Sequence, residues 1–171
     1  MEYKEFEKEF LVELDKNNIK NVTNSEKFYK YMKLLLEWNE KINLTAIKDE
    51  KEFIVKHFID SLTIEKYITN GEKVLHIGTG AGFPGIPIKI TKNKSHVDLV
   101  DSVNKKLNVI RDIIPKIKLE INPLLLRKAT ISIAFGYRFS PIGVKHIRIA
   151  QLNAPNKFSN QVTISFFGLI L

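Results

Sequence analysis

The sequence predicts an α/β fold in which a helical N-terminal region precedes a parallel sheet. Apolar residues recur at helical spacing up to about residue 68. Beyond Asn70 they gather into two short runs, and each run leads into a further helical pattern. Such alternation of strand and helix is typical of a parallel α/β sheet. We therefore divide the chain into a helical region (1–68), the first half of a nucleotide-binding sheet domain (69–120) and a segment of unusual composition (121–171).

Three helices are expected in the helical region. The first covers residues 2–16, and the second follows the good N-cap residues at 23–25 and runs to about Lys41. The third begins after Asp49, which has the spacing of a capping box with Glu52. The residues of this third helix expected to face inward are Phe53, Ile54, His57, Phe58 and Leu62.

Two strand–helix units are expected next. Residues 73–77 and 96–101 read as strands, and residues 86–90 and 104–114 as the helices that follow them. Past Pro115 the helical pattern fades, although residues 129–135 and 162–167 have the character of strands. A doubly wound sheet needs more units than these, so the predicted sheet is a truncated one.

A glycine-rich loop joins the first strand to its helix. Residues 78–85 (GTGAGFPG) contain four glycines in eight positions. Glycine adopts positive φ and lets a ligand approach the backbone, and the helix that follows presents free N–H groups. The loop could hold a nucleotide or the polar end of an amino-acid-like cofactor. The alternative is a tight strand-to-helix turn with no ligand.

The type of ligand depends on Asp101 and on the glycine spacing. Asp101 ends the second strand, about 20 residues past the loop, where a carboxylate can accept both hydroxyls of an adenosine ribose. The alternative role is that of N-cap for the next helix. Dinucleotide sites favour G-x-G-x-x-G, but here Phe83 takes the place of the third glycine. This favours S-adenosylmethionine over NAD.

Charge is distributed unevenly along the chain. The net charge is +8 and the sequence pI is about 9.5, which makes RNA or DNA a plausible partner, although a lysine-rich surface without a specific partner is the alternative. All 19 acidic residues lie between Glu2 and Glu120. Residues 121–171 could therefore be a basic RNA-binding extension, a disordered tail or a sequence read out of frame, and we favour the last.

Several classes of protein are not expected. The chain has no cysteine, which excludes disulfides and thiolate metal sites, and its histidines lack metal-ligand spacing, so no metal is predicted. It has no apolar run long enough for a membrane span and no signal-peptide pattern at its start. We expect a cytoplasmic protein, monomeric and without a membrane partner.

Four motifs carry a family resemblance. They are residues 35–47 (LLEWNEKINLTAI), 55–62 (VKHFIDSL), 78–87 (GTGAGFPGIP) and 101–106 (DSVNKK). Over about residues 1–120 the chain resembles the glucose-inhibited division protein B family, the bacterial 16S ribosomal RNA guanine-N7 methyltransferases of RsmG type. The resemblance implies a class I methyltransferase (Rossmann-like) fold, S-adenosylmethionine as methyl donor, and 16S ribosomal RNA or the small ribosomal subunit as partner.

The resemblance also implies roles for individual residues. Gly78, Gly80, Gly82 and Phe83 would line the cofactor, and Asp101 would hold its ribose. No catalytic residue is assigned, because guanine N7 is a lone-pair acceptor with no proton to remove, so methyl transfer needs no general base. Candidate phosphate contacts, which are solvated helix faces in the alternative interpretation, are Lys33, Lys41, Lys56, Lys105, Lys106 and Arg111. We expect His57 and Trp38 to be packed core residues, with contact to substrate or cofactor as the alternative for His57.

The chain departs from the family pattern in two places. His76 stands where the family usually has an acid, so we expect weaker cofactor binding, unless His76 is only a buried strand residue. After Glu120 we find neither the Gly-Arg-Ala-Glu-like loop nor the Ser-Arg-Ala motif of the family, whose chains are also longer. A non-catalytic nucleotide-binding fragment is therefore the alternative function. An NAD-dependent oxidoreductase is a third, but the loop lacks the third glycine that dinucleotide sites favour.

Overall fold

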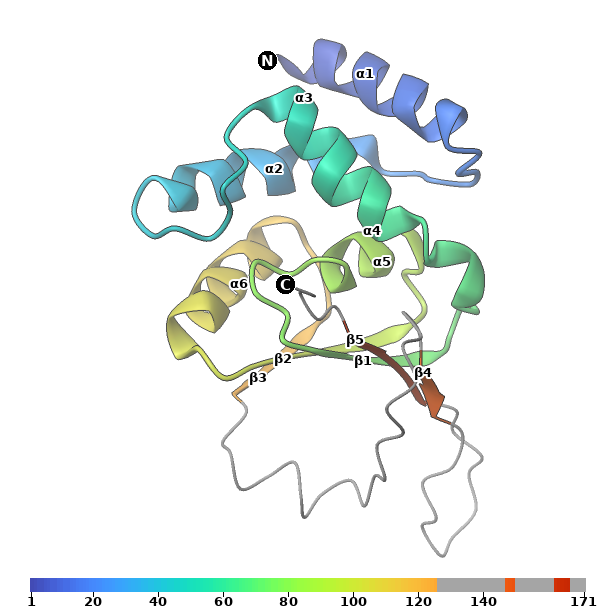
Figure 1. The fold of residues 1–171 in the computed structure, drawn as a ribbon, viewed down its shortest axis with the longest axis vertical. Coiled ribbons are helices and arrows are strands. Elements are labelled where there is room, and N and C mark those ends of the chain that lie inside the picture. Colours follow the sequence, from blue (N-terminus) through green and yellow to red (C-terminus); the bar gives the residue numbers. More distant parts are fainter. Residues whose placement is uncertain (126–146, 150–161, 167–171) are drawn as a thin grey trace, which may run out of the picture.

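The computed structural model describes residues 1–125, 147–149 and 162–166 (Figure 1). Helices form the N-terminal part, as the sequence predicts. The third predicted helix is one continuous helical run, but its middle is a π-helix. The elements of this part are α1 (Tyr3–Lys16), α2 (Ser25–Asn39), α3 (Glu50–Phe53), the π-helix η1 (Ile54–Ile59), α4 (Asp60–Leu62) and the 3₁₀ turn η2 (Glu65–Tyr67).

Helix caps and apolar spacing account for these elements. Helix α1 buries Phe6, Phe10 and Leu14, which share one face at a spacing of four residues. The backbone N–H of Glu52 donates to the Asp49 carboxylate at 2.8 Å, which confirms the predicted cap at the start of α3.

The two predicted strand–helix units are confirmed. Strand β1 (Lys73–Ile77) leads into α5 (Gly85–Thr91), and β2 (His96–Asp101) leads into α6 (Asn104–Lys116). Strands β1 and β2 are parallel and in register from Lys73 opposite His96 to Ile77 opposite Val100. Parallel strands place their carboxyl ends at one edge, so the glycine loop after β1 and Asp101 at the end of β2 meet there.

Three further strands extend this sheet to the order β3-β2-β1-β5-β4. They are β3 (Asn122–Leu125), β4 (Ile147–Ile149) and β5 (Val162–Phe166). Strands β3 and β5 run parallel to their neighbours, and β4 is antiparallel to β5. Strand β5 falls within the predicted 162–167, whereas β3 and β4 were not predicted; the expected strand at 129–135 lies outside the described residues. Strand β3 contains Pro123, and a proline in a sequence argues against a strand unless that strand lies at the edge of a sheet. Because β3 is an edge strand, the proline is tolerated there, but the sequence pattern did not indicate it.

One hydrophobic core joins the helical region to the sheet. Figure 1 shows the layers: α5 and α6 cover one face of the sheet, and the N-terminal helices lie across them. Buried side chains of one continuous cluster come from both parts of the chain, from Phe6 in α1 to Ile113 in α6. The glycine loop is therefore packed between the sheet and the N-terminal helices. Among the described residues, no helix is both long and apolar enough to cross a lipid bilayer.

Candidate functional site at the glycine loop

The glycine loop turns sharply where β1 ends. The backbone N–H groups of Gly78 and Thr79 both donate to the Val100 carbonyl of β2, at 2.7 and 3.0 Å. Gly78, Gly80 and Gly82 have φ values of +75°, +57° and +103°, a region that side chains disfavour. The glycines are therefore needed for the path of the backbone.

The three glycines differ in what surrounds them. A Cβ atom on Gly78 would meet nothing within 4 Å, and one on Gly80 would meet only the Gly78 carbonyl oxygen, at 4.0 Å. A Cβ on Gly82 would lie 2.5 Å from Cδ1 of Ile86 and 2.7 Å from the hydroxyl of Tyr31. Gly78 and Gly80 thus border open space, as a ligand requires, whereas Gly82 permits close packing of the loop against the protein.

Asp101 fastens the loop to the end of β2. Its carboxylate accepts from the backbone N–H of Gly80 at 2.7 Å through Oδ2 and from that of Val103 at 2.8 Å through Oδ1. Val103, and not Asp101, is the N-cap of α6, although Asp101 does satisfy a backbone donor there. A carboxylate has about four lone-pair positions, so these bonds leave acceptor capacity for ribose hydroxyls.

Two backbone donors in the loop are unused. The N–H groups of Ala81 and Phe83 have no hydrogen-bond partner among the residues that the structure describes, whereas the N–H of Gly82 between them donates to the Thr79 carbonyl. Backbone N–H groups without a partner in a glycine-rich loop are suited to a carboxylate or phosphate. The loop residues therefore fit the polar end of an anionic or zwitterionic ligand.

Aromatic rings of the helical region surround Phe83, the last predicted loop contact. The ring of Phe83 lies parallel to that of His57, with 4.4 Å between ring centroids and 4° between planes. The other rings around it belong to Tyr31, Phe53 and Phe58. Predicted as an inward core residue, His57 is half-buried and touches the loop instead.

Tyr31 is a loop contact that sequence reasoning missed. It is fully buried in α2, and its hydroxyl donates to the Ala81 carbonyl at 2.6 Å. Burial raises the pKa of Tyr31 well above its ordinary value, so the hydroxyl keeps its proton. The signal that could have found it is a tyrosine in an otherwise apolar stripe, because a buried hydroxyl needs a partner.

His76 is buried at the end of β1, 1% exposed. Its Nδ1 lies 3.0 Å from the Thr79 hydroxyl, and Nε2 has no hydrogen-bond partner among the described residues. Burial lowers the pKa of His76 to about 4, against the attraction of the nearby Asp101 carboxylate. The imidazole is therefore neutral at pH 7, so it places no positive charge beside the loop.

Of the candidate phosphate contacts, several cations are already paired. Lys33 lies 2.9 Å from Glu50, Lys41 lies 3.7 Å from Glu37, and Lys56 pairs with Glu52. Arg111 donates to the side chains of Asn104 and Asn108. Lys105 and Lys106 have no ion pair within the described part of the chain. Trp38 is half-buried, and its indole N–H donates to Asp112 at 2.8 Å, which links α2 to α6.

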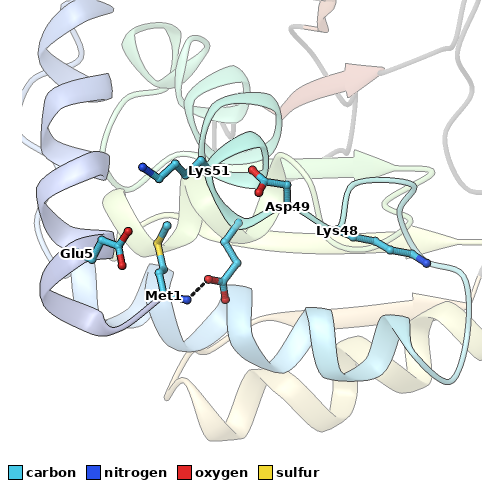
Figure 2. Close-up of a pocket in the computed structure, with 6 residues that line it drawn as sticks. Met1, Glu5, Lys48, Asp49 and Lys51 are labelled. Atoms are coloured by element: carbon cyan, nitrogen blue, oxygen red, sulfur yellow. Dashed lines mark hydrogen bonds and ion pairs between the residues drawn. The ribbon is translucent and has the colours of Figure 1, made fainter.

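A separate pocket of about 350 Å³ lies in the helical region (Figure 2). Its lining comes from the start of α1, the start of α3 and the residues just before α3, with no residue of the glycine loop. The Met1 ammonium forms an ion pair with Glu50 inside it. The described residues contain no cluster of three His, Asp or Glu side chains that could hold a metal ion.

Comparison with known protein families identifies one match. The family model described as rRNA small subunit methyltransferase G matches residues 24–132, more than half of the chain. The match continues past Glu120, the point where sequence analysis expected resemblance to end, and stops within residues that the structure does not describe.

Individual relatives carry the same description. The Ribosomal RNA small subunit methyltransferase G of Desulforamulus reducens is 55% identical over 94 residues, which cover 54% of this chain and 39% of the relative. That of Clostridium kluyveri is 46% identical over 101 residues, which cover 58% of this chain and 43% of the relative. The chain spans about two fifths of the length of these relatives.

Solved structures give a weaker likeness. A protein-L-isoaspartate O-methyltransferase matches with a TM-score of 0.44 and 14% identity, covering 70% of this chain and 41% of that chain. M. capricolum TrmK, solved with S-adenosyl-homocysteine, matches with a TM-score of 0.37 and 22% identity, covering 44% of this chain and 34% of that chain.

Proposed function

Because the chain belongs to the rRNA small subunit methyltransferase G family, we propose that the glycine loop is the methyl-donor site of an S-adenosylmethionine-dependent rRNA methyltransferase. The proposed acceptor is N7 of a guanine in 16S ribosomal RNA, with the small ribosomal subunit of the cytoplasm as partner. The observation that supports the donor site most directly is the open space beside Gly78 and Gly80 together with the free N–H groups of Ala81 and Phe83.

The residues of the loop would share the binding of the donor. The N–H groups of Ala81 and Phe83 would bind the carboxylate of its methionine end, and the Asp101 carboxylate would accept from the ribose hydroxyls. When bound, S-adenosylmethionine supplies a methyl group on a positively charged sulfur. The neutral imidazole of His76 avoids a like charge there.

No proton needs to be moved for this reaction. Guanine N7 attacks through its lone pair, so the task of the protein is to hold N7 and the methyl carbon in line. This is consistent with a site in which the groups at the loop are backbone donors, one carboxylate and neutral side chains.

Isothermal titration calorimetry with S-adenosylhomocysteine, S-adenosylmethionine and NAD tests the proposal. We expect binding of S-adenosylhomocysteine in the micromolar range. No binding would indicate a non-catalytic fragment, and a preference for NAD would indicate an oxidoreductase.

Two glycines provide a matched pair of variants for this experiment. Gly71 and Gly78 have φ values of +93° and +75°, and a Cβ on either would meet nothing within 4 Å. They lie on opposite sides of the five-residue strand β1, Gly71 before its start and Gly78 directly after its end. Gly78→Val should abolish binding, whereas Gly71→Val should cause similar backbone strain and leave binding intact. Equal affinities in the two variants would contradict a donor site at the loop.

A further inference from the structure

The side chain of His57 contacts two loops at once. It hydrogen-bonds to Thr45 and stacks on Phe83. Its ring lies parallel to the ring of Phe83 in the glycine loop. It lies edge-on to the ring of Phe53, and the centroids of the His57 and Phe53 rings are 4.6 Å apart. Its Nε2 lies 2.7 Å from the Thr45 hydroxyl. The ring therefore joins the loop after α2 to the glycine loop.

The π-helix η1 explains how this contact forms. In an α-helix, Phe53 would share a face with His57, four residues on, but less closely with Phe58, five residues on. The wider π-turn brings both rings to Phe53, and the centroids of Phe53 and Phe58 lie 5.3 Å apart. Single π-turns inside α-helices occur frequently at functional sites.

Asn39 fixes the position of Thr45. The Asn39 side chain accepts from the backbone N–H groups of Leu44 and Thr45, at 2.7 and 3.0 Å, and donates to the Thr45 carbonyl at 2.9 Å. Asn39 is itself buried. The Thr45 hydroxyl is thus held in place by a rigid anchor before it meets His57.

We infer that the Thr45 hydroxyl donates to His57, because the opposite direction would leave the hydroxyl proton without an acceptor among the described residues. The N–H of Ile47 already donates to the Thr45 hydroxyl oxygen, at 3.1 Å. The single hydroxyl proton of Thr45 then has one acceptor among the described residues, Nε2 of His57. The neutral ring carries its own proton on Nδ1. Burial lowers the pKa of His57 to about 4, which keeps the ring neutral at pH 7.

We propose that His57, oriented by Thr45, is a positioning residue that holds the Phe83 ring and thereby the free N–H groups of the glycine loop for the methyl donor. The inference rests on the proposed function, because the loop must bind that donor. The helical region then acts on the donor site through His57 without touching the donor.

The experiment compares the affinity for S-adenosylhomocysteine, measured by calorimetry, with the melting temperature of each variant. His57→Ala loses both the stacked ring and the bond to Thr45, and should weaken binding about tenfold. His57→Phe keeps a ring for stacking and should recover most of that loss. Thr45→Val removes the hydroxyl at nearly constant volume and should fall between the two.

A control variant distinguishes positioning from loss of stability. Phe28 packs against Phe10 and Phe58 in the same aromatic cluster but has no ring contact with Phe83. Phe28→Leu should lower the melting temperature and leave the affinity unchanged. The inference is wrong if Phe28→Leu weakens binding as much as His57→Ala, or if His57→Ala binds like the wild type.

Side-chain nitrogen NMR tests the proton assignment without any ligand. The ¹⁵N shifts of His57 should show a proton on Nδ1 and none on Nε2, and the opposite tautomer would overturn the assignment of Thr45 as the donor in this hydrogen bond. Failure of the wild-type chain to bind S-adenosylhomocysteine would overturn the proposed function, and with it this inference. Wild-type binding combined with unaffected variants would overturn the inference alone.

Discussion

At the scale of single residues, the site depends on groups that are buried but neutral. His76 and Tyr31 both lie within the core beside the glycine loop. Burial lowers the pKa of His76 and raises that of Tyr31, so each side chain stays neutral at pH 7. The loop is thus held by hydrogen bonds from uncharged side chains, and Asp101 is the one carboxylate of the described residues that bonds to its backbone. Such a site avoids the desolvation of further charges.

His76 should make the stability of the protein depend on pH. Its pKa is about 4 in the folded chain and 6.5 ordinarily, so between these values the unfolded chain takes up a proton that the folded chain does not. The free energy of unfolding should therefore fall as the pH is lowered from 6.5 through 4. The loss attributable to His76 is about 3 kcal/mol when complete. Above about pH 8, where His76 is neutral in the folded and in the unfolded chain, it contributes almost no slope.

A variant that cannot titrate isolates this effect. His76→Asn places a polar atom close to the position of Nδ1, near the Thr79 hydroxyl, and carries no titratable group. Urea denaturation of both proteins at several pH values should give a flatter profile for His76→Asn. Some slope should remain, because His57 also has a lowered pKa, of about 4. Parallel profiles for the two proteins would show that His76 is not the group responsible.

At the scale of elements, local patterns were sufficient for some parts and not for others. Short stretches rich in Val, Leu and Ile predicted β1 and β2 with their observed bounds. The helix cap at Asp49 could also be predicted from the sequence, because its hydrogen-bond partner Glu52 is three residues away. These elements are determined by contacts close in sequence, which a single sequence displays.

The parts that sequence reasoning missed depend on distant contacts. The π-turn in η1 brings rings together around Phe83, some 25 residues further along the chain, and no local periodicity encodes it. Tyr31 and its acceptor Ala81 are separated by 50 residues. The glycine loop itself was predicted, but which glycines border open space follows from packing against Ile86 and Tyr31.

The segment between α2 and α3 should depend on one side chain. Asn39→Ala would remove its three hydrogen bonds to Leu44 and Thr45 and leave their backbone groups unpaired. The free energy of unfolding, measured by urea denaturation, should fall by about 2–3 kcal/mol. Asn43 lies exposed in the same segment, and Asn43→Ala should change the free energy of unfolding by less than about 0.5 kcal/mol. Similar losses in both variants would contradict the role of Asn39 as an anchor.

At the scale of the whole molecule, the helical region and the sheet are not independent. One cluster of buried residues runs through both, and the sequence division near residue 68 does not coincide with a break in it. Helix α2 contacts both α5 and α6, and the bond from Trp38 to Asp112 adds a polar link. Regions that share a core are expected to unfold together.

Phe58 is the residue through which this cooperativity can be tested. It is fully buried in the helical region and contacts rings from α1, α2 and the glycine loop. Phe58→Leu should lower the free energy of unfolding by about 1–2 kcal/mol. In native-state hydrogen exchange, the amides of β1 and β2 should then lose as much protection as those of α1, because both open in the same global event. Leu107→Ala, a change in α6 of the sheet part, should in turn reduce protection in α1. If each variant affected only its own part of the chain, the two parts would be separate folding units, and the helical region could not position the glycine loop as the contacts of His57 and Tyr31 require.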